Sequence, residues 1–320
     1  MEVATGAPIP QGANAVIPVE YTSQKGDVVK VYRAAHPSEN VSSAGSDLMA
    51  GELALRRGVK LSSRELGILA ALGLKEVACY VRPRVAILST GSELAEPGSM
   101  LPPGKIYDIN SFSLHAAVVE LGCIPLFLGV VPDEASRLKA KILEGLSHAH
   151  LVLVSGGTSA GAGDILYRVL EELSGSLLFH GVAVKPGKPT VAAVVEGKLV
   201  IGLPGYPTSA LMIFHRLVKP VLAAMMGFQL GEEEAVEAVL GEKVFSEQGR
   251  REFLPVHLYL GEKGLVAFPC KGGSGAITTL ASADGFLEIG EDRVILDEGC
   301  LLYTSPSPRD LSTSRMPSSA

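Results

Sequence analysis

Tryptophan is absent from this 320-residue chain, and aromatic residues make up only 5% of it. A surface for stacking nucleobases is therefore not indicated. Basic residues form no block and the net charge is −6, so neither nucleic acid nor an anionic membrane is an expected partner. Apolar runs of the roughly 18 residues that a membrane span needs are missing, and the first residues lack the pattern of a signal peptide.

Cysteine occurs only four times, at distant positions and never as a C-x-x-C pair. This spacing argues against a zinc site or a disulfide framework and fits a reducing cytoplasm. Cys79 and Cys123 stand in apolar contexts, which predicts buried packing residues. The sequence contains no H-E-x-x-H or Walker A motif, so these metalloprotease and nucleotide-binding signatures do not apply.

What is present is enough apolar sequence for two or three domains, since 47% of the residues are hydrophobic. In the middle of the chain, short apolar runs alternate with helical patterns, which predicts an α/β domain with a doubly wound, mostly parallel sheet. Shorter strands at the end predict a small, barrel-like all-β domain. At the start, strands over 13–21 and 27–32 and a helix opened by Ser62 or Ser63 are expected. The predicted parts are a partial β-rich domain (1–45), an α+β linker domain (46–83), the α/β domain (84–228), the β domain (229–300) and a tail (301–320).

One run, L-V-L-V-S-G-G-T-S-A-G-A-G-D over residues 151–164, is the most informative. A short apolar run ends in a loop with four glycines, closes on Asp164, and is followed by a helical pattern over 165–173. Many α/β proteins hold phosphates in this way, because glycine lets the backbone approach the ligand and a helix N-terminus offers free N–H groups. Asp164 suggests a bound metal ion, since a bare carboxylate would repel phosphate. A glycine turn that binds nothing is the alternative.

Two more loops of this kind follow. The run V-A-V-K-P-G-K-P places Lys185 and Lys188 around a Pro-Gly turn, which favours contact with an anion over a plain surface role. Residues 198–211 predict a strand, a Gly/Pro loop and a helix that begins near Thr208 or Ser209, either of which could cap it. Loops after parallel strands meet at one edge of the sheet, where open α/β sheets bind ligands.

Carboxylates follow most strands of the predicted sheet. Glu93, Asp108, Asp133 and Asp164 stand just after apolar runs, where they would face the ligand crevice. Several acids together suit Mg²⁺ held between carboxylates and phosphate oxygens, and Glu93 and Asp164 are the expected metal ligands. Asp108 and Asp133 could instead cap helices. The histidines suggest neither a triad nor a metal cluster, and His180, just before the lysine loop, is the one that could belong to the site.

Six motifs, in this order, resemble the MoeA family: T-G-A-P-I-P-Q-G-A-N-A-V-I-P-V-E, L-S-T-G-S-E-L, I-Y-D-I-N, S-G-G-T-S-A-G-A-G-D, V-K-P-G-K-P and G-L-P-G-Y-P-T-S-A. These are molybdopterin molybdenumtransferases, related to proteins such as the gephyrin E domain. The resemblance implies a cytoplasmic enzyme of molybdenum cofactor biosynthesis. It implies that molybdate is inserted into adenylylated molybdopterin with the help of Mg²⁺, that AMP is released, and that the full-length protein is a homodimer.

The resemblance also assigns roles to residues. Family acids important for activity match Asp47, Glu93, Asp133 and Asp164, and the anion-binding lysine matches Lys185. These five are the expected catalytic residues. The other expected site residues would bind the substrate: Thr5, Thr90, Gly91, Ser155, Gly156, Gly157, Thr158, Ser159, Gly161, Lys188, Pro204, Gly205, Pro207 and Ser209.

The chain departs from the family pattern at both ends. Family members have a longer N-terminal segment, so the resemblance implies an N-terminally truncated chain. Gly181 stands where some relatives carry a lysine, and Tyr206 where others carry an asparagine. Residues 301–320 are rich in Ser and Pro without periodicity, which predicts a disordered, non-native tail in place of the last β strand.

Three other functions stay open. An adenylyltransferase-type molybdopterin-binding protein, or an amidase relative, would share the sheet domain only, and residues 1–82 together with the β domain argue against both. A non-catalytic, gephyrin-like scaffold would bind a partner peptide with this fold. A truncated, inactive fragment is the third possibility.

Overall fold

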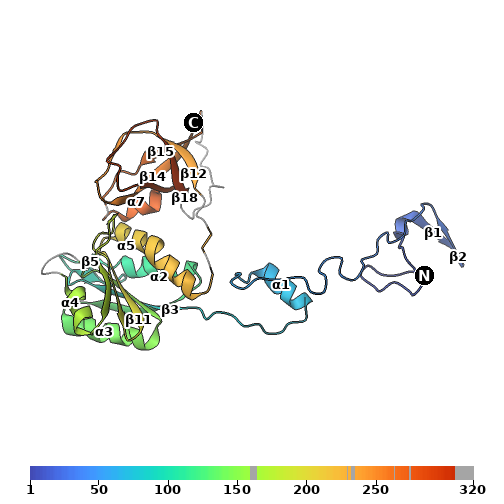
Figure 1. Ribbon diagram of the computed structural model, residues 1–320, viewed down its shortest axis with the longest axis horizontal. Helices are drawn as coiled ribbons and strands as arrows, with labels where there is room; N and C mark the ends of the chain where they lie inside the picture. The colour runs from blue at the N-terminus through green and yellow to red at the C-terminus, as the bar shows by residue number, and fades with distance from the viewer. Residues whose placement is uncertain (159–163, 229, 232–234, 263, 274, 307–320) are drawn as a thin grey trace. The chain divides into compact units, whose positions relative to one another are not determined.

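The computed structural model describes residues 1–320 except 159–163, 229, 232–234, 263, 274 and 307–320. The chain divides into two compact units, Met1–Val77 and Ala78–Ala320 (Figure 1). Each unit is described separately below.

The first unit is built around one hairpin and one helix. β1 (Thr22–Lys25) and β2 (Val28–Val31) pair antiparallel after a short 3₁₀ turn, η1 (Val19–Tyr21). The strand predicted over 27–32 is confirmed as β2, but the one predicted over 13–21 is wrong. That run contains Pro18, which cannot donate to a ladder. None of residues 1–77 is buried, so this unit has no hydrophobic core of its own.

Helix α1 (Ser63–Ala71) confirms the start signal read in the sequence. Ser62 is the N-cap, and it forms a capping box with Glu65, the third helical residue. Hydrogen bonds from the hydroxyl and the backbone N–H of Ser62 hold the pKa of the Glu65 carboxyl below its usual value. The helix leaves Leu66, Ile68 and Leu72 exposed.

The second unit begins with the predicted α/β domain. Its six-stranded sheet has the order β6-β3-β7-β11-β10-β8, and the first four strands are parallel. Only β10 runs against its neighbours, so the mostly parallel sheet is confirmed. The strands are β3 (Arg84–Thr90), β6 (Ile124–Val131), β7 (Leu151–Ser155), β8 (Ser176–His180), β10 (Val191–Val195) and β11 (Lys198–Leu203).

Helices cover both faces of this sheet (Figure 1). All five residues of the central strand β7 are buried, with Val152 and Val154 in one core and Leu151 and Leu153 in the other. Such a strand is a continuous apolar run, since both of its faces are covered. α3 (Ala135–His148) and α4 (Ile165–Glu172) pack on one face. The other face is covered by α2 (Asn110–Glu120), α5 (Pro207–Ile213), the π-helical turn η2 (Phe214–Val218) and α6 (Lys219–Met225). Two short strands, β4 (Leu94–Ala95) and β5 (Ile106–Tyr107), form a separate parallel pair.

The helical stretch Pro207–Met225 differs from two expectations. It begins at Pro207, with Tyr206 as N-cap and no side-chain cap, so neither Thr208 nor Ser209 caps it. Proline suits this first position because it has no N–H to leave unpaired. The stretch is also long and apolar enough to cross a membrane, although about half of it is buried inside the protein. In the structure it packs into the sheet core.

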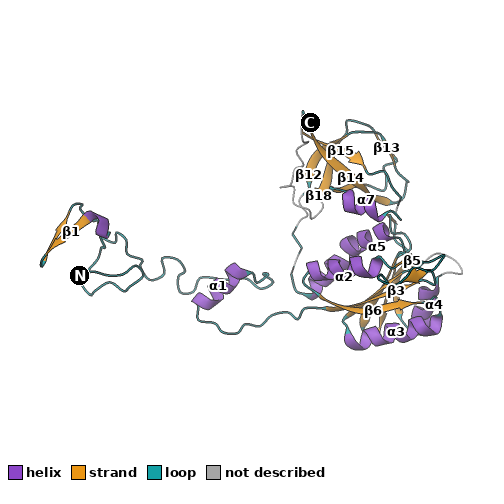
Figure 2. Cartoon of the chain, turned by 180° about the vertical axis from the view of Figure 1, so that it is seen from behind, coloured by secondary structure: helices purple, strands orange, loops and turns teal. Residues whose placement is uncertain are grey.

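In the β domain, the strands β15, β12, β18, β16 and β14 form a closed ring, because β14 also pairs with β15 (Figure 2). A further strand, β9 (Val184–Lys185), comes from the lysine loop of the α/β domain and pairs parallel with β14. The other elements are β12 (Val236–Leu240), β13 (Val244–Phe245), β14 (Arg251–Gly261), β15 (Gly264–Pro269), α7 (Ile277–Ser282), β16 (Gly285–Ile289), β17 (Ile295–Leu296) and β18 (Leu301–Pro306).

Strand β18 corrects the expectation of a disordered tail from residue 301 and of a lost last strand. Leu301–Pro306 pairs antiparallel with β12 on one side and with β16 on the other. The residues L-L-Y-T of this segment favour a β strand, and the edges of β12 and β16 offer unpaired backbone groups for it to pair with. The rest of the predicted tail, 307–320, lies outside the described residues.

Candidate functional site

The candidate site is the carboxyl edge of the α/β sheet. β3, β7 and β11 are adjacent and parallel, and β8 has the same direction because it and β11 both run against β10. The loops after these four strands therefore open on the same side of the sheet. We call them the β3 loop (90–93), the β7 loop (155–158), the lysine loop (181–190) and the β11 loop (203–207).

Two glycines bring the β7 loop against its neighbours. Gly156 (φ 93°) donates its N–H to the Leu203 carbonyl over 3.1 Å, and Gly157 (φ 64°) accepts from the Leu166 N–H over 3.2 Å. Both φ values lie in the left-handed region that favours glycine. A Cβ at Gly156 would overlap the carbonyl oxygen of Thr90. The β3, β7 and β11 loops are thus in close contact through backbone alone.

We expect Gly156→Ala to destabilise the protein by more than about 2 kcal/mol, because the methyl group clashes with the Thr90 carbonyl and the φ value is unfavourable. Gly205→Ala is the matched control, since the nearest atom to its added Cβ is 3.8 Å away. Chemical denaturation of both variants measures the difference. Equal stabilities would contradict the tight backbone contact.

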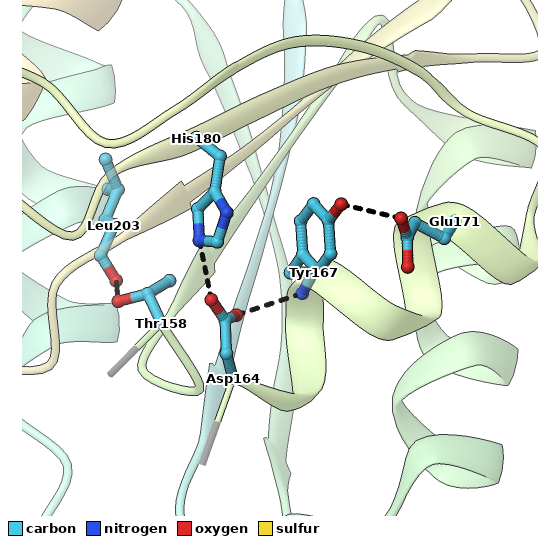
Figure 3. Close-up of polar contacts among 6 residues, drawn as sticks. All are labelled: Thr158, Asp164, Tyr167, Glu171, His180 and Leu203. Atoms are coloured by element: carbon cyan, nitrogen blue, oxygen red, sulfur yellow. Dashed lines mark hydrogen bonds and ion pairs between the residues drawn. The ribbon is translucent and has the colours of Figure 1, made fainter. Parts of the chain in front are cut away.

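Asp164 lies at the end of the β7 loop and has two partners (Figure 3). Its Oδ1 accepts the Tyr167 N–H over 3.2 Å, which makes it the N-cap of α4. Its Oδ2 lies 2.6 Å from His180 Nε2, at the end of β8. The His180 ring stacks on Tyr167 with centroids 4.5 Å apart. A hydrogen bond from Tyr167 to Glu171, 2.6 Å long, and the charge of Glu171 raise the pKa of the Tyr167 phenol, which keeps it neutral.

These contacts correct part of the expected phosphate site. The glycine loop was expected to leave free N–H groups at the start of α4. In the structure the Leu166 N–H donates to Gly157 and the Tyr167 N–H to Asp164. Two donors of the first turn are therefore already used within the protein, because the loop folds back over its own helix.

The other carboxylates do not gather around Asp164. Asp133 accepts from the Thr90 hydroxyl (2.7 Å) and ties the β3 loop to the end of β6, whereas the N-cap of α3 is Glu134. Asp108 is buried and accepts from the Ser111 N–H in the first turn of α2, although the N-cap residue of this helix is Ile109. Glu93 is exposed. The described residues contain no group of three or more His, Cys, Asp or Glu side chains that could hold a metal ion.

The lysine loop is joined to the β domain. Lys185 Nζ lies 3.2 Å from Glu252 Oε1 and 3.6 Å from Glu247 Oε1. The Glu252 side chain is 9% exposed and also accepts from the Ser246 hydroxyl over 2.6 Å. Lys188 is exposed. Sequence reasoning found both lysines but missed Glu252, because its partner is far away in the chain.

The remaining predicted residues divide by their place in the chain. Thr5 and Asp47 are exposed residues of the first unit. Ser159 and Gly161 lie outside the described residues. At the sheet edge, Gly205 is exposed and most of the other predicted residues are buried. The Ser155 hydroxyl accepts a hydrogen bond from Asn110, a residue that sequence reasoning also missed. The buried members of this group are Thr90, Gly91, Ser155, Gly156, Thr158, Pro204 and Ser209, and Gly157 and Pro207 are half-buried.

The cysteines take no part in this edge. Burial raises the pKa of Cys123 and of Cys270 to about 11, so both stay thiols at neutral pH. The prediction that Cys123 is buried is confirmed, but the same prediction for Cys79 is wrong, since Cys79 is exposed. The segment before β3 in which it lies contains no buried residue up to Arg82.

Comparison with known proteins agrees with this architecture. Residues 86–224 match the model of a probable molybdopterin binding domain. Residues 1–73 match the MoeA N-terminal region (domain I and II), and residues 237–301 the MoeA C-terminal region (domain IV).

Relatives of known name cover most of the chain. A protein of Haemophilus influenzae named molybdopterin molybdenumtransferase is 33% identical over 96% of this chain and 76% of its own length. Molybdopterin molybdenumtransferase 2 of Mycobacterium tuberculosis is 36% identical over 94% of this chain and 75% of its own. A solved molybdopterin biosynthesis moeA protein from Pyrococcus horikosii superposes with a TM-score of 0.79 and 40% identity, covering 93% of this chain and 73% of that one.

Proposed function

The chain belongs to the MoeA family of molybdopterin molybdenumtransferases, and from this we propose that it transfers molybdenum from molybdate to adenylylated molybdopterin and releases AMP. The chain is thus a transferase of molybdenum cofactor biosynthesis, and the adenylylated substrate and the release of AMP are the proposed details. The observation that carries the proposal is that the segments after β7, β8 and β11 are bonded to one another. Gly156 N–H donates to the Leu203 carbonyl, and His180 contacts Asp164.

The residues at this edge suit tetrahedral oxyanions. Molybdate and the phosphates of an adenylylated pterin are both of this kind, and lysine ammonium groups bind them as point charges. Lys188 is exposed, and Lys185 lies on the same loop between the two domains. In this proposal the lysine loop binds the anion, the β7 and β11 loops orient the substrate beside it, and buried Pro204 keeps water from one side.

Mg²⁺ fits this edge poorly as a resident ion. Both oxygens of Asp164 have protein partners, and the described residues contain no group of three or more His, Cys, Asp or Glu side chains that could hold a metal ion. Magnesium in phosphoryl sites takes most of its ligands from phosphate oxygens and water. We therefore propose that any Mg²⁺ used by this enzyme arrives with the substrate.

Asp164→Asn should lower turnover by about ten- to hundredfold, the effect of losing one charge-assisted hydrogen bond, while stability changes little. Asparagine caps helices as well as aspartate does, so the bond from Tyr167 can persist, but the charge beside His180 is gone. Turnover at limiting Mg²⁺ and the thermal midpoint measure the two effects. Normal turnover would show that Asp164 only caps α4.

A homodimer is part of the proposal as well. Residues 1–77 bury no side chain, and α1 exposes Leu66, Ile68 and Leu72. Apolar surface without a core favours association, and we propose a second copy as the partner. Sedimentation at micromolar concentration should give twice 33.4 kDa, and a monomer would contradict this. The cytoplasmic location predicted from the cysteines stays a prediction, which cell fractionation tests.

The proposed reaction is tested by giving the purified chain adenylylated molybdopterin and molybdate. We expect AMP together with a cofactor that activates a molybdenum-free apoenzyme. An adenylyltransferase would instead form pyrophosphate from ATP and molybdopterin. A scaffold or an inactive fragment would form neither product, and this result would refute the proposed activity.

A further inference from the structure

Asn110, the first residue of α2, lies beneath two strand-end loops. It is 7% exposed. Its Nδ2 donates to the Ser155 hydroxyl and to the Gly205 carbonyl, both over 2.7 Å. Ser155 ends β7 and Gly205 follows β11, its neighbour in the sheet. One amide group therefore connects the start of α2 with the β7 and β11 loops.

The orientation of this amide follows from its partners. The Gly205 carbonyl can only accept, so the NH₂ group faces it and Oδ1 points elsewhere. Within the part of the chain that the structure describes, Asn110 Oδ1 is buried without a hydrogen-bond partner, as is Asp108 Oδ2 two residues earlier. A buried acceptor without a partner destabilises the folded state. The net contribution of Asn110 to stability is therefore small, and the position of the β11 loop is what its side chain determines.

The β11 loop that Asn110 holds is also where the β domain meets the α/β domain. A Cβ added at Gly275 would lie 3.5 Å from the Tyr206 ring, so Tyr206 reaches the β domain. The Thr208 hydroxyl donates to the Ala276 carbonyl over 3.5 Å. A shift of Gly205 would therefore move the loop relative to Ser155 on one side and to the β domain on the other.

We propose that Asn110 is a positioning residue for the transferase reaction, which acts by holding the Gly205 carbonyl in register with Ser155. This rests on the proposed function, because the β11 loop is taken to orient the substrate. Misplacement of a substrate-orienting loop by about 1 Å can cost a hundredfold in rate. Asn110 itself touches no reacting atom in this proposal.

The test compares Asn110→Asp with Asn110→Ala and with Ser111→Ala as the matched control. Aspartate keeps the shape but sets an acceptor against the Gly205 carbonyl. Ser111 is also buried, lies in the same helical turn and bonds the Ser89 hydroxyl over 2.8 Å, and within the described residues its hydroxyl bonds neither the β7 loop nor the β11 loop. Thermal midpoint, kcat, KM and amide hydrogen exchange over 203–208 and 270–276 are measured for each.

Both Asn110 variants should speed exchange in the two segments and lower kcat by about ten- to hundredfold, with KM close to that of Ser111→Ala. The thermal midpoint of Asn110→Ala should be close to that of Ser111→Ala, whereas Asn110→Asp should lower it further, because the carboxylate is buried without a partner. Unchanged exchange, or a kcat loss no larger than in the control, would overturn the proposal. If the wild-type chain lacks turnover, the proposed function fails, and the exchange measurement still decides whether Asn110 holds the loop.

Discussion

Deleting residues 301–320 should unfold the β domain at temperatures where the α/β domain is still folded. β18 lies between β12 and β16, and its loss leaves the edges of Val236–Val239 and Gly285–Leu287 that faced it without backbone partners. Unpaired backbone groups in the middle of a sheet cost more than a small domain can lose, since whole domains are stable by only about 5–15 kcal/mol. Calorimetry should show an early transition that the intact chain lacks.

Deleting only residues 307–320 is the control, because every described strand is kept. The intact chain and this shorter variant should have the same first transition. If the longer deletion also matches them, β18 contributes nothing to the β domain, and the original expectation of a dispensable tail from residue 301 would be restored.

Lys185→Ala should weaken oxyanion binding by about ten- to hundredfold, the loss expected for one charge-assisted hydrogen bond of roughly 1.5–3 kcal/mol. It should also lower stability, because Glu252 keeps its buried carboxylate but loses the cation 3.2 Å away. Since the lysine side chain is 36% exposed, solvent screening limits this second effect to about 1–2 kcal/mol. Titration with molybdate and denaturation with urea measure the two quantities.

A double variant separates these effects. In Lys185→Ala with Glu252→Gln, the uncompensated charge is removed while the amide can still accept from Ser246. Stability should return toward that of the intact chain, and molybdate affinity should stay low. Recovery of both would show that Lys185 acts only through its ion pair and does not bind the anion.

The sequence predicts the parts of this fold that depend on local patterns. A strand was expected over 27–32 and a helix after Ser62 or Ser63, and both are confirmed as β2 and α1. Apolar runs buried on both faces, capping residues and glycine turns act within a few residues of each other. The mostly parallel sheet followed from the same alternation of strands and helices.

The sequence does not predict contacts between distant residues. Glu252 lies beside Lys185 because β9 pairs with β14 of the β domain. Asn110 bonds Gly205, which is 95 positions away in the sequence. β18 was missed for the same reason, since its short β-prone segment is stabilised by two strands far back in the chain. Asp164 carried a metal-ligand pattern, yet a helix cap and His180 use both of its oxygens.

We propose that the lysine loop forms the molybdate site of a molybdenumtransferase, with the β11 loop beside it. Crystals of the protein soaked in molybdate, measured at the molybdenum absorption edge, test it most directly. We predict the strongest anomalous peak within hydrogen-bond distance of the Lys185 or Lys188 ammonium group, and its loss in Lys185→Ala if that lysine binds the anion. A strongest peak away from residues 181–190 and 203–207, or no peak at saturating molybdate, would contradict the account.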